Sequence, residues 1–316
     1  MTSFAIDDPV YAAVELGSDS FRLHVARVEA GVLRVAASMA EPVRLAAALD
    51  EDGFLGPEAM RRALDCLREF RSALALWRPH AVRVVATSAL RIARNAQAFL
   101  PAAAHAIGYP VEIIRAEEEG RLVYLGVAST LGAHAERRLV VDVRSASTEL
   151  VLGRGADVEC IESFGVGAVR QSLSFFGGGR LDAGLFDAAV RSARDKFSDA
   201  ALAGAPRRWS RAYGACGTVR ALAGILAEDG DGGPGRLTPA SLEALRRRFI
   251  DVGHMDRVRR AWPAAANAPY LAGGLALLIA LMDEFGLEEL APVHAGLRVG
   301  TIWDLHQRGV AQPVAV

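Results

Sequence analysis

The sequence predicts an α/β protein made of two similar halves with a cleft between them. Short apolar strands alternate with amphipathic helices along the chain, which is the pattern of α/β folds. A strand–turn–strand unit occurs twice, at residues 14–24 and 141–151, and each time an acid ends the first strand and hydroxyl groups fill the turn. The length of 316 residues also suits two domains of ordinary size.

The first half is expected to open with an antiparallel meander. Alternating apolar residues across short turns predict its strands at Val10–Val14, His24–Val28 and Leu33–Ser38. The spacing of apolar residues from Pro57 to Trp77 predicts a long helix. The later elements are predicted, in order, as strand Val82–Ala86, helix Ala89–Leu100, strand Val111–Ile114 and helix Glu117–Leu125.

The pattern begins again after Gly132, so we place the boundary between the halves near residues 126–138. This gives an N-terminal domain of residues 8–126 and a C-terminal domain of residues 127–310. The elements predicted for the second half are strands Leu139–Val143, Leu150–Gly153 and Glu159–Phe164 and helices Leu185–Phe197, Ala221–Leu226 and Leu237–Ile250. Glycine-rich residues 230–235 predict a flexible loop.

Composition predicts a soluble protein of a reducing compartment. Hydrophobic residues make up 52% of the chain and charged residues 23%, and the three cysteines lie far apart, which favours neither a disulfide framework nor a zinc site. The N-terminal residues lack the pattern of a secretion signal. The longest apolar run, Leu271–Met282, is shorter than the roughly 20 residues of a membrane span. We expect a cytoplasmic protein without a membrane partner.

The charge balance limits the choice of ligand. A net charge of −1 creates no overall field that would attract nucleic acid, so a phosphate chain must be bound by a local basic site. Almost all basic residues are arginines, and Lys196 is the only lysine. Mechanisms that need a lysine in a phosphate loop therefore have a single candidate.

The turn Gly17-Ser18-Asp19-Ser20 has the composition of an anion-binding nest. Glycine and small hydroxyl residues let backbone N–H groups point at one spot, and Arg22 lies close by as a charged donor. A plain hairpin turn uses the same residues, and this alternative stays open.

A second segment runs from Thr87-Ser88 through Arg91 to Asn95. A strand ends, hydroxyls can cap the following helix, and an arginine occupies the first turn. The N-terminal end of a helix carries partial positive charge, so an arginine there is favoured when an anion is bound. The alternative is a solvated arginine on a capped helix.

Two further segments carry candidate chemistry. The acids of Glu117-Glu118-Glu119 open a helix, where they either complement the helix dipole or supply a carboxylate that orients water for attack on phosphorus. Gly217-Thr218 form a turn before a helix, which is either a phosphate cradle or a structural turn. Cys216 is expected to be a packing residue, because no histidine lies near it in the sequence.

Six segments together resemble the exopolyphosphatase and guanosine-pentaphosphate phosphohydrolase family. They are, in order, AAVELGSDSFRLHVARV, ATSALRIARNA, VEIIRAEEEGRLVYLGV, RLVVDVRSASTELVLG, GACGTVRALA and GLRVG, from about residue 10 to about residue 305. The resemblance implies two actin-like (ribonuclease H-like) domains in the short form of the family. It further implies hydrolysis of a terminal phosphoanhydride in inorganic polyphosphate or guanosine pentaphosphate, usually with Mg²⁺, guanosine penta- or tetraphosphate as the nucleotide partner, and a homodimer.

The resemblance also implies roles by position. Glu119 matches the catalytic glutamate that orients the attacking water, and Asp142, Glu149 and Glu15 match acids associated with the metal. The residues implied to bind phosphate are Ser18, Ser20, Arg22, Arg91, Asn95, Arg144, Ser145, Ser147, Thr148, Gly217 and Thr218.

Both loops depart from the family pattern. The first usually begins with aspartate, and here begins with Glu15 and also carries Asp19. The second usually contains three glycines, and here reads Arg144-Ser145-Ala146. Side chains in left-handed conformations cost roughly 1 kcal/mol each if the glycine geometry is kept. Two interpretations of Arg144 compete: it supplies positive charge in place of Mg²⁺, or it blocks the loop.

Three functions remain open at this point. The first is a phosphohydrolase that releases terminal phosphate. The second is a sensor that binds polyphosphate or an alarmone without turnover, as the altered second loop suggests. The third, an actin-like sugar kinase, is disfavoured by the match at Glu118-Glu119 and by the lack of an evident adenosine site.

Overall fold

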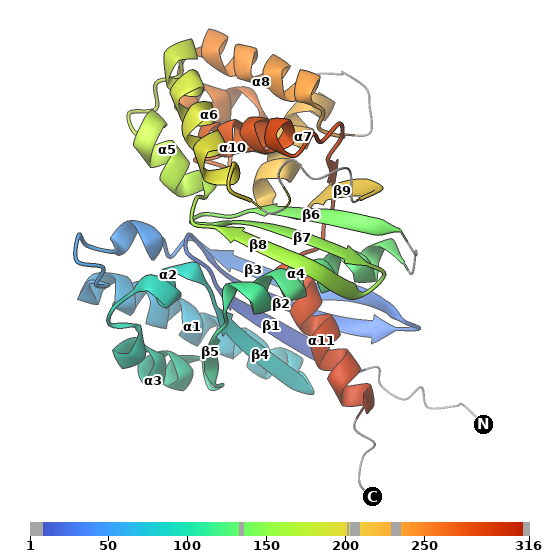
Figure 1. Cartoon of the computed structure of the whole chain (residues 1–316). Helices are drawn as coiled ribbons and strands as arrows, with labels where there is room; N and C mark the ends of the chain where they lie inside the picture. The colour runs from blue at the N-terminus through green and yellow to red at the C-terminus, as the bar shows by residue number, and fades with distance from the viewer. Residues whose placement is uncertain (1–8, 133–135, 201, 203–208, 229–234, 312–316) are drawn as a thin grey trace, which may run out of the picture. The chain divides into compact units, whose positions relative to one another are not determined.

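The computed structural model describes residues 9–132, 136–200, 202, 209–228 and 235–311 of the chain. It divides into two compact units. The first comprises residues 1–131 together with residues 295–316, and the second comprises residues 132–294. Each unit is an α/β structure around one five-stranded mixed sheet (Figure 1).

The sheet of the first unit has the strand order β3-β2-β1-β4-β5. Strands β1, β2 and β3 form the predicted antiparallel meander, whereas β4 and β5 run parallel to β1. The strands are β1 Val10–Leu16, β2 Phe21–Glu29, β3 Val32–Glu41, β4 Ala81–Ala86 and β5 Val111–Ile113. The parallel register places Leu16 of β1 opposite Ala86 of β4, so the turns that follow these two strands lie side by side.

The sheet of the second unit repeats this topology. Its order is β10-β9-β6-β7-β8, with β7 antiparallel to β6 and β8, and with β9 parallel to β6 and β10. The strands are β6 Arg137–Val143, β7 Thr148–Arg154, β8 Asp157–Phe164, β9 Arg211–Gly214 and β10 Ala291–Pro292. The internal duplication that the repeated strand–turn–strand pattern predicts is therefore confirmed.

Helices cover both faces of the first sheet (Figure 1). They are α1 Pro57–Trp77, α2 Ser88–Ile92, α3 Ala96–Ile107, α4 Ala116–Leu131 and α11 Leu297–Ala311, with a short 3₁₀ turn η1 at Ala46–Ala48. All of β1 is buried, because Ala12 and Val14 face the core under α1 while Tyr11 and Ala13 pack with Ile302 of α11. Strands covered on both faces read as continuous apolar runs, as β1 does.

The helices of the second unit pack around a large hydrophobic core. They are α5 Ala168–Phe176, α6 Ala183–Phe197, α7 Gly217–Glu228, α8 Pro239–Val252, α9 Met255–Ala261 and α10 Leu271–Glu284, with η2 at Pro263–Ala265. The apolar run from Leu271 to Met282 is buried on every side of α10, so it is a core helix. Of the helices in the described ranges, none is both long and apolar enough to cross a membrane.

The observed division differs from the predicted boundary at residues 126/127. Helix α4 continues to Leu131, so that boundary falls inside a helix. The chain also returns to the first unit at Ala295, and α11 packs on α4 and β1. Glycines permit this packing: a Cβ on Gly300 would lie 1.7 Å from the carbonyl oxygen of Leu122.

The helix predicted at Ala89–Leu100 is two helices, α2 and α3. Asn95 lies between them, and its side-chain amide bonds the backbone of Leu55 in both directions. These bonds hold the chain in a non-helical conformation, which residue periodicity alone does not reveal. The loop predicted at residues 230–235 falls outside the described residues except for Gly235, which has a positive φ of 61°. The predicted cleft and homodimer stay predictions.

Candidate active site

The first hairpin turn joins β1 to β2 and lies against the start of α2. A Cβ on Gly17 would be 2.6 Å from the carbonyl oxygen of Ser20, so the tight turn requires glycine. The Ser18 Oγ accepts a hydrogen bond from the backbone N–H of Ala89 (3.1 Å) and lies 2.8 Å from the Oγ of Ser88. Both serines are buried. Ser18 therefore ties the two turns together.

The side chain of Arg22, at the end of this turn, has hydrogen-bond donors that can bind a ligand. The Arg22 Nε donates to the Oγ of Ser20 at 2.9 Å, and within the described ranges the two terminal nitrogens of Arg22 have no protein partner. Burial raises the pKa of the Asp19 carboxyl, although the charges of Arg44 and Arg22 oppose this shift. The turn thus offers guanidinium donors to an anion, as its composition suggests.

The pair formed by Arg91 and Glu119 is the most buried charged contact among the predicted site residues of this unit. Glu119 is in the first turn of α4 and is 0% exposed. The Arg91 NH1 donates to the Glu119 Oε2 at 2.6 Å and to the carbonyl oxygen of Ile114 at 2.9 Å. Both bonds use one terminal nitrogen, and no other described group bonds the remaining nitrogens of Arg91. Arg91 can therefore hold the carboxylate with one nitrogen and bind an anion with the others.

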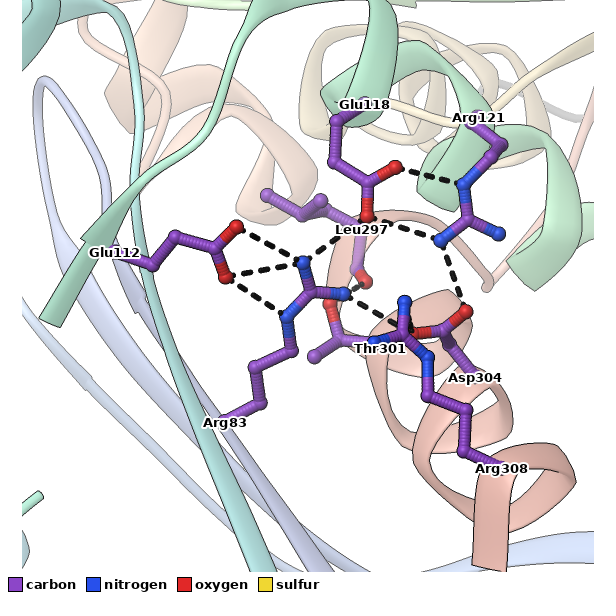
Figure 2. A network of polar contacts seen from close by, with 8 residues as sticks. All are labelled: Arg83, Glu112, Glu118, Arg121, Leu297, Thr301, Asp304 and Arg308. Atoms are coloured by element: carbon purple, nitrogen blue, oxygen red, sulfur yellow. Dashed lines mark hydrogen bonds and ion pairs between the residues drawn. The ribbon is translucent and has the colours of Figure 1, made fainter. Parts of the chain in front are cut away.

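The neighbouring acid Glu118 points into a different environment. It belongs to a network of charged side chains from β4, β5, α4 and α11, namely Arg83, Glu112, Glu118, Arg121, Asp304 and Arg308 (Figure 2). Arg83 NH2 lies 3.0 Å from Glu118 Oε1, and Arg83 NH1 lies 3.1 Å from the buried Asp304. The network ties the first turn of α4, which carries Glu119, to the C-terminal helix.

Two predicted site residues have structural partners instead. The amide oxygen of Asn95 accepts a hydrogen bond from the backbone N–H of Leu55, and its amide nitrogen donates to the carbonyl oxygen of Leu55. Asn95 therefore holds the loop in place. Glu15 is 6% exposed and forms an ion pair with Arg298 of α11, which lies in the same unit. Sequence reasoning missed Arg298 as the partner of Glu15, because the two are 283 positions apart and only the segment GLRVG pointed to this arginine.

The second hairpin turn joins β6 to β7 and is hydrogen-bonded to the first residues of α5. The backbone N–H of Arg144 donates to the carbonyl oxygen of Ser147 (2.9 Å), and the N–H groups of Ala168 and Val169 bond the carbonyl oxygens of Arg144 (2.7 Å) and Ser145 (3.0 Å). None of Arg144, Ser145 and Ala146 has a positive φ. The strain expected from the lost glycines is therefore absent from this turn, because its backbone avoids the left-handed region.

The hydroxyl groups of this turn bond the protein itself. The Ser147 Oγ lies 2.6 Å from the Glu149 Oε1, and the Thr148 Oγ1 donates to the carbonyl oxygen of Val166 at 2.8 Å. Ser147, Thr148 and Glu149 are all buried. These contacts stiffen the turn, and they employ two of the hydroxyls that were predicted to bind phosphate.

The residues predicted to bind a metal fit a magnesium site poorly. Asp142 and Glu149 lie opposite each other on β6 and β7, but the Arg144 NH1 is 3.5 Å from the Asp142 Oδ2. Glu15 is paired with Arg298. Within the described part of the chain, no group of three or more His, Cys, Asp or Glu residues is arranged so that it could hold a metal ion. Mg²⁺ demands a near-octahedral set of oxygens, and a guanidinium beside the carboxylate opposes it.

The turn at Gly217-Thr218 lies beside the second hairpin turn. Strand β9 runs parallel to β6, with Gly214 opposite Val141, so both turns leave the same edge of the sheet. Gly217 is exposed, and a Cβ there would approach only the Arg220 side chain, at 4.0 Å. Burial and the charge of Asp142 raise the pKa of the Cys216 thiol to about 11, which agrees with a packing role and not with a nucleophile.

The two units thus present the same arrangement, a hairpin turn beside a strand-to-helix turn. This duplicated arrangement is that of a known protein family. The model of the Ppx/GppA phosphatase family matches residues 24–308 of the chain. The chain belongs to the Ppx/GppA phosphatase family.

Solved structures agree with this membership. The Ppx/GppA family member of Aquifex aeolicus matches with a TM-score of 0.81 at 23% identity, covering 95% of this chain and 98% of that one. An exopolyphosphatase from Cytophaga hutchinsonii matches with a TM-score of 0.82 at 19% identity, covering 95% and 98%. An exopolyphosphatase-like protein matches with a TM-score of 0.79 at 24% identity, covering 96% and 99%. At these identities the likeness establishes the fold, and the predicted α/β architecture of two similar halves is confirmed.

Within this Ppx/GppA fold, the structure brings several predicted residues together. In the first unit Ser18 contacts the start of α2, Ser20 contacts Arg22, and Arg91 contacts Glu119. In the second unit a separate set of contacts joins Asp142 to Arg144 and Ser147 to Glu149. Sequence reasoning gave Ser88 only a helix-capping role and gave Arg220 none, although both lie in segments that carry the family resemblance.

Proposed function

We propose that this protein releases terminal phosphate from inorganic polyphosphate, with guanosine pentaphosphate as a second substrate. Membership of a phosphatase family supports hydrolysis in general. The observation that carries the finer proposal is the pair of Arg91 and Glu119, at 2.6 Å. A fully buried carboxylate is costly without a compensating charge, and this one is compensated by an arginine that keeps donors for an anion.

The proposed chemistry follows from this pair. Glu119 orients a water molecule whose oxygen forms a bond to the terminal phosphorus, and its carboxylate accepts the proton that the water loses. The bond from that phosphorus to the bridging oxygen breaks, and the shortened chain departs with the bridging oxygen. Arg91 and Arg22 stabilise the negative charge on the non-bridging oxygens, which is the main demand of phosphoryl transfer.

Phosphate release from long-chain polyphosphate by the purified protein tests this proposal. Wild type should release phosphate, and Glu119→Gln should reduce the rate by about 100-fold or more, because general-base catalysis typically contributes 10²–10⁴-fold. The matched control is Glu117→Gln, in the same helical turn but exposed to solvent, which should retain wild-type turnover. Equal activity of Glu119→Gln and wild type would contradict the assigned role.

The second turn favours one alternative, a sensor that binds polyphosphate or an alarmone without hydrolysing it. Two of the hydroxyls in that turn, those of Ser147 and Thr148, bond the protein itself. Calorimetric binding of polyphosphate together with undetectable phosphate release would support the sensor. Turnover by the wild type that Glu119→Gln abolishes would exclude it.

A further inference from the structure

The positive charge beside Asp142 belongs to a side chain of the protein, that of Arg144. We propose that the guanidinium of Arg144 takes the place of a divalent ion next to this carboxylate, so that the second unit binds phosphate oxygens without a metal. The inference rests on the proposed function only in naming phosphate as the ligand. It corresponds to the first of the two interpretations of Arg144 that the sequence leaves open.

The position of the side chain supports this inference. The Arg144 NH1 lies 3.5 Å from the Asp142 Oδ2, and both side chains are largely buried, with exposed fractions of 14% and 7%. A guanidinium carries five N–H donors in a planar fork that matches carboxylate and phosphate oxygens. A positive group is thus present at the acid that the family resemblance associates with the metal.

The backbone holds Arg144 in this place. Its own N–H and C=O groups are bonded to Ser147 and to the first turn of α5. A Cβ on Gly167 would lie 2.5 Å from the carbonyl carbon of Ser145, so α5 approaches the turn as closely as glycine allows. The arginine therefore projects from a backbone that is already ordered, so anion binding at this turn does not have to order the backbone first.

The nearby Glu149 carboxylate already has hydroxyl partners on one of its oxygens. The Glu149 Oε1 lies 2.6 Å from the Ser147 Oγ and 3.5 Å from the Ser163 Oγ. A magnesium ion at Asp142 would have to displace the guanidinium or lie beside its positive charge. Like charges at such distances repel strongly in a buried site, so the bound arginine weakens metal binding.

Titration of the full-length protein with Mn²⁺, followed by electron paramagnetic resonance, tests the inference without any substrate. Arg144→Gln removes the charge and keeps a polar, though shorter, side chain, and it should bind Mn²⁺ at least tenfold more tightly than wild type. Adding Asp142→Asn to this variant should abolish the gain. Arg154→Ala, which removes an exposed arginine at the far end of the same hairpin, should behave as wild type.

Equal Mn²⁺ affinity of wild type and Arg144→Gln would overturn the inference. Thermal unfolding would show whether Arg144→Gln is folded, and Arg144→Gly, which restores the usual residue of the loop, serves as the second variant. An increase in Mn²⁺ affinity in either folded variant that Asp142→Asn does not reverse would also count against the assigned site.

Binding of long-chain polyphosphate in EDTA and in Mg²⁺ separates this inference from the proposed function. Wild type should bind equally well in both, whereas Arg144→Gln should bind at least tenfold more weakly in EDTA and recover in Mg²⁺. Wild-type binding that requires Mg²⁺ would overturn the inference. Absence of polyphosphate binding in every variant would reject the proposed function, while the Mn²⁺ titration would still decide the role of Arg144.

Discussion

Arg91 holds the buried carboxylate of Glu119 and also has nitrogens that can bind a ligand. One terminal nitrogen bonds both the buried Glu119 and the carbonyl oxygen of Ile114, and the side chain remains 21% exposed. A guanidinium spreads five donors over three nitrogens, so one nitrogen can hold these two oxygens while the others bind a ligand. The family motif located both residues in the sequence, but the contact between them became visible only in the structure.

Replacing Arg91 by lysine should therefore impair turnover while the protein stays folded. Lysine keeps the charge but offers one nitrogen, so a donor to the transition state is lost. The loss of one such donor typically lowers kcat about 10²–10³-fold. Steady-state kinetics with polyphosphate would measure the effect, and Arg94→Lys, an exposed arginine three positions along, is the control. A similar loss in both variants would indicate a general charge effect.

At the scale of elements, the packing of α11 on α4 attaches the C-terminal helix to the first unit. Gly126 and Gly300 face each other there, and a Cβ on Gly126 would lie 2.4 Å from the carbonyl oxygen of Gly296. The backbones can approach this closely only without side chains. The charged network around Asp304 lies along the same pair of helices (Figure 2).

Gly300→Ala should consequently destabilise the protein by about 3 kcal/mol or more, because the added methyl group overlaps the backbone of α4. Urea unfolding would measure the change. Gly309→Ala in the same helix meets only the Tyr11 hydroxyl at 3.5 Å and should be neutral, or should stabilise the helix by up to about 1 kcal/mol. Equal effects of the two substitutions would show that helix propensity, and not packing, dominates.

The network also predicts a pH dependence of stability. Burial alone would raise the pKa of Glu118, but hydrogen bonds and charges from Arg121 and Arg83 outweigh it and hold the pKa below the usual value of 4.5. Because the folded pKa lies below the unfolded one, the stability contributed by Glu118 is complete above about pH 4.5 and is lost as pH falls through the folded pKa.

Urea unfolding at a series of pH values from neutral downward would detect this loss. Glu118→Gln should be less stable than wild type at neutral pH, and the difference should shrink as the pH falls through the folded pKa. Glu117→Gln, at an exposed position of the same turn, should follow the wild-type curve. A constant difference between Glu118→Gln and wild type at all pH values would contradict the ionic origin of the effect.

At the scale of the whole molecule, the two units differ in how the chain builds them. The second is continuous, residues 132–294, and has its own hydrophobic core. The first needs residues 295–316 from the other end of the chain, and Ile302 of α11 is 0% exposed in its core. A continuous unit with a closed core can fold independently, whereas a unit that lacks a core helix exposes apolar strand surface.

A fragment of residues 132–294 should therefore unfold cooperatively on its own, and a fragment of residues 1–131 should not. Joining residues 295–316 to the shorter fragment through a flexible linker should restore cooperative unfolding. Circular dichroism during urea titration would report each transition. Cooperative unfolding of residues 1–131 alone would show that α11 is dispensable for the first unit.

The sequence by itself determined the local features of this protein. The period of apolar residues located most strands and helices, including α1 with the observed bounds, and six ordered segments identified the family and the candidate Glu119. These features depend on neighbouring residues, or on motifs that keep their order along the chain. The helix predicted across Asn95 was wrong, because the bonds that interrupt it come from Leu55, 40 positions away.

Only the tertiary structure decided which distant residues meet. It assigned α11 to the first unit, paired Glu15 with Arg298 across 283 positions, and joined Arg91 to Glu119. It also showed that the turn at Arg144 avoids the left-handed backbone conformations for which glycine would be needed, and that the arginine lies beside Asp142. Such contacts depend on how helices and strands pack in three dimensions, and residue spacing along the chain does not encode that packing in any local pattern.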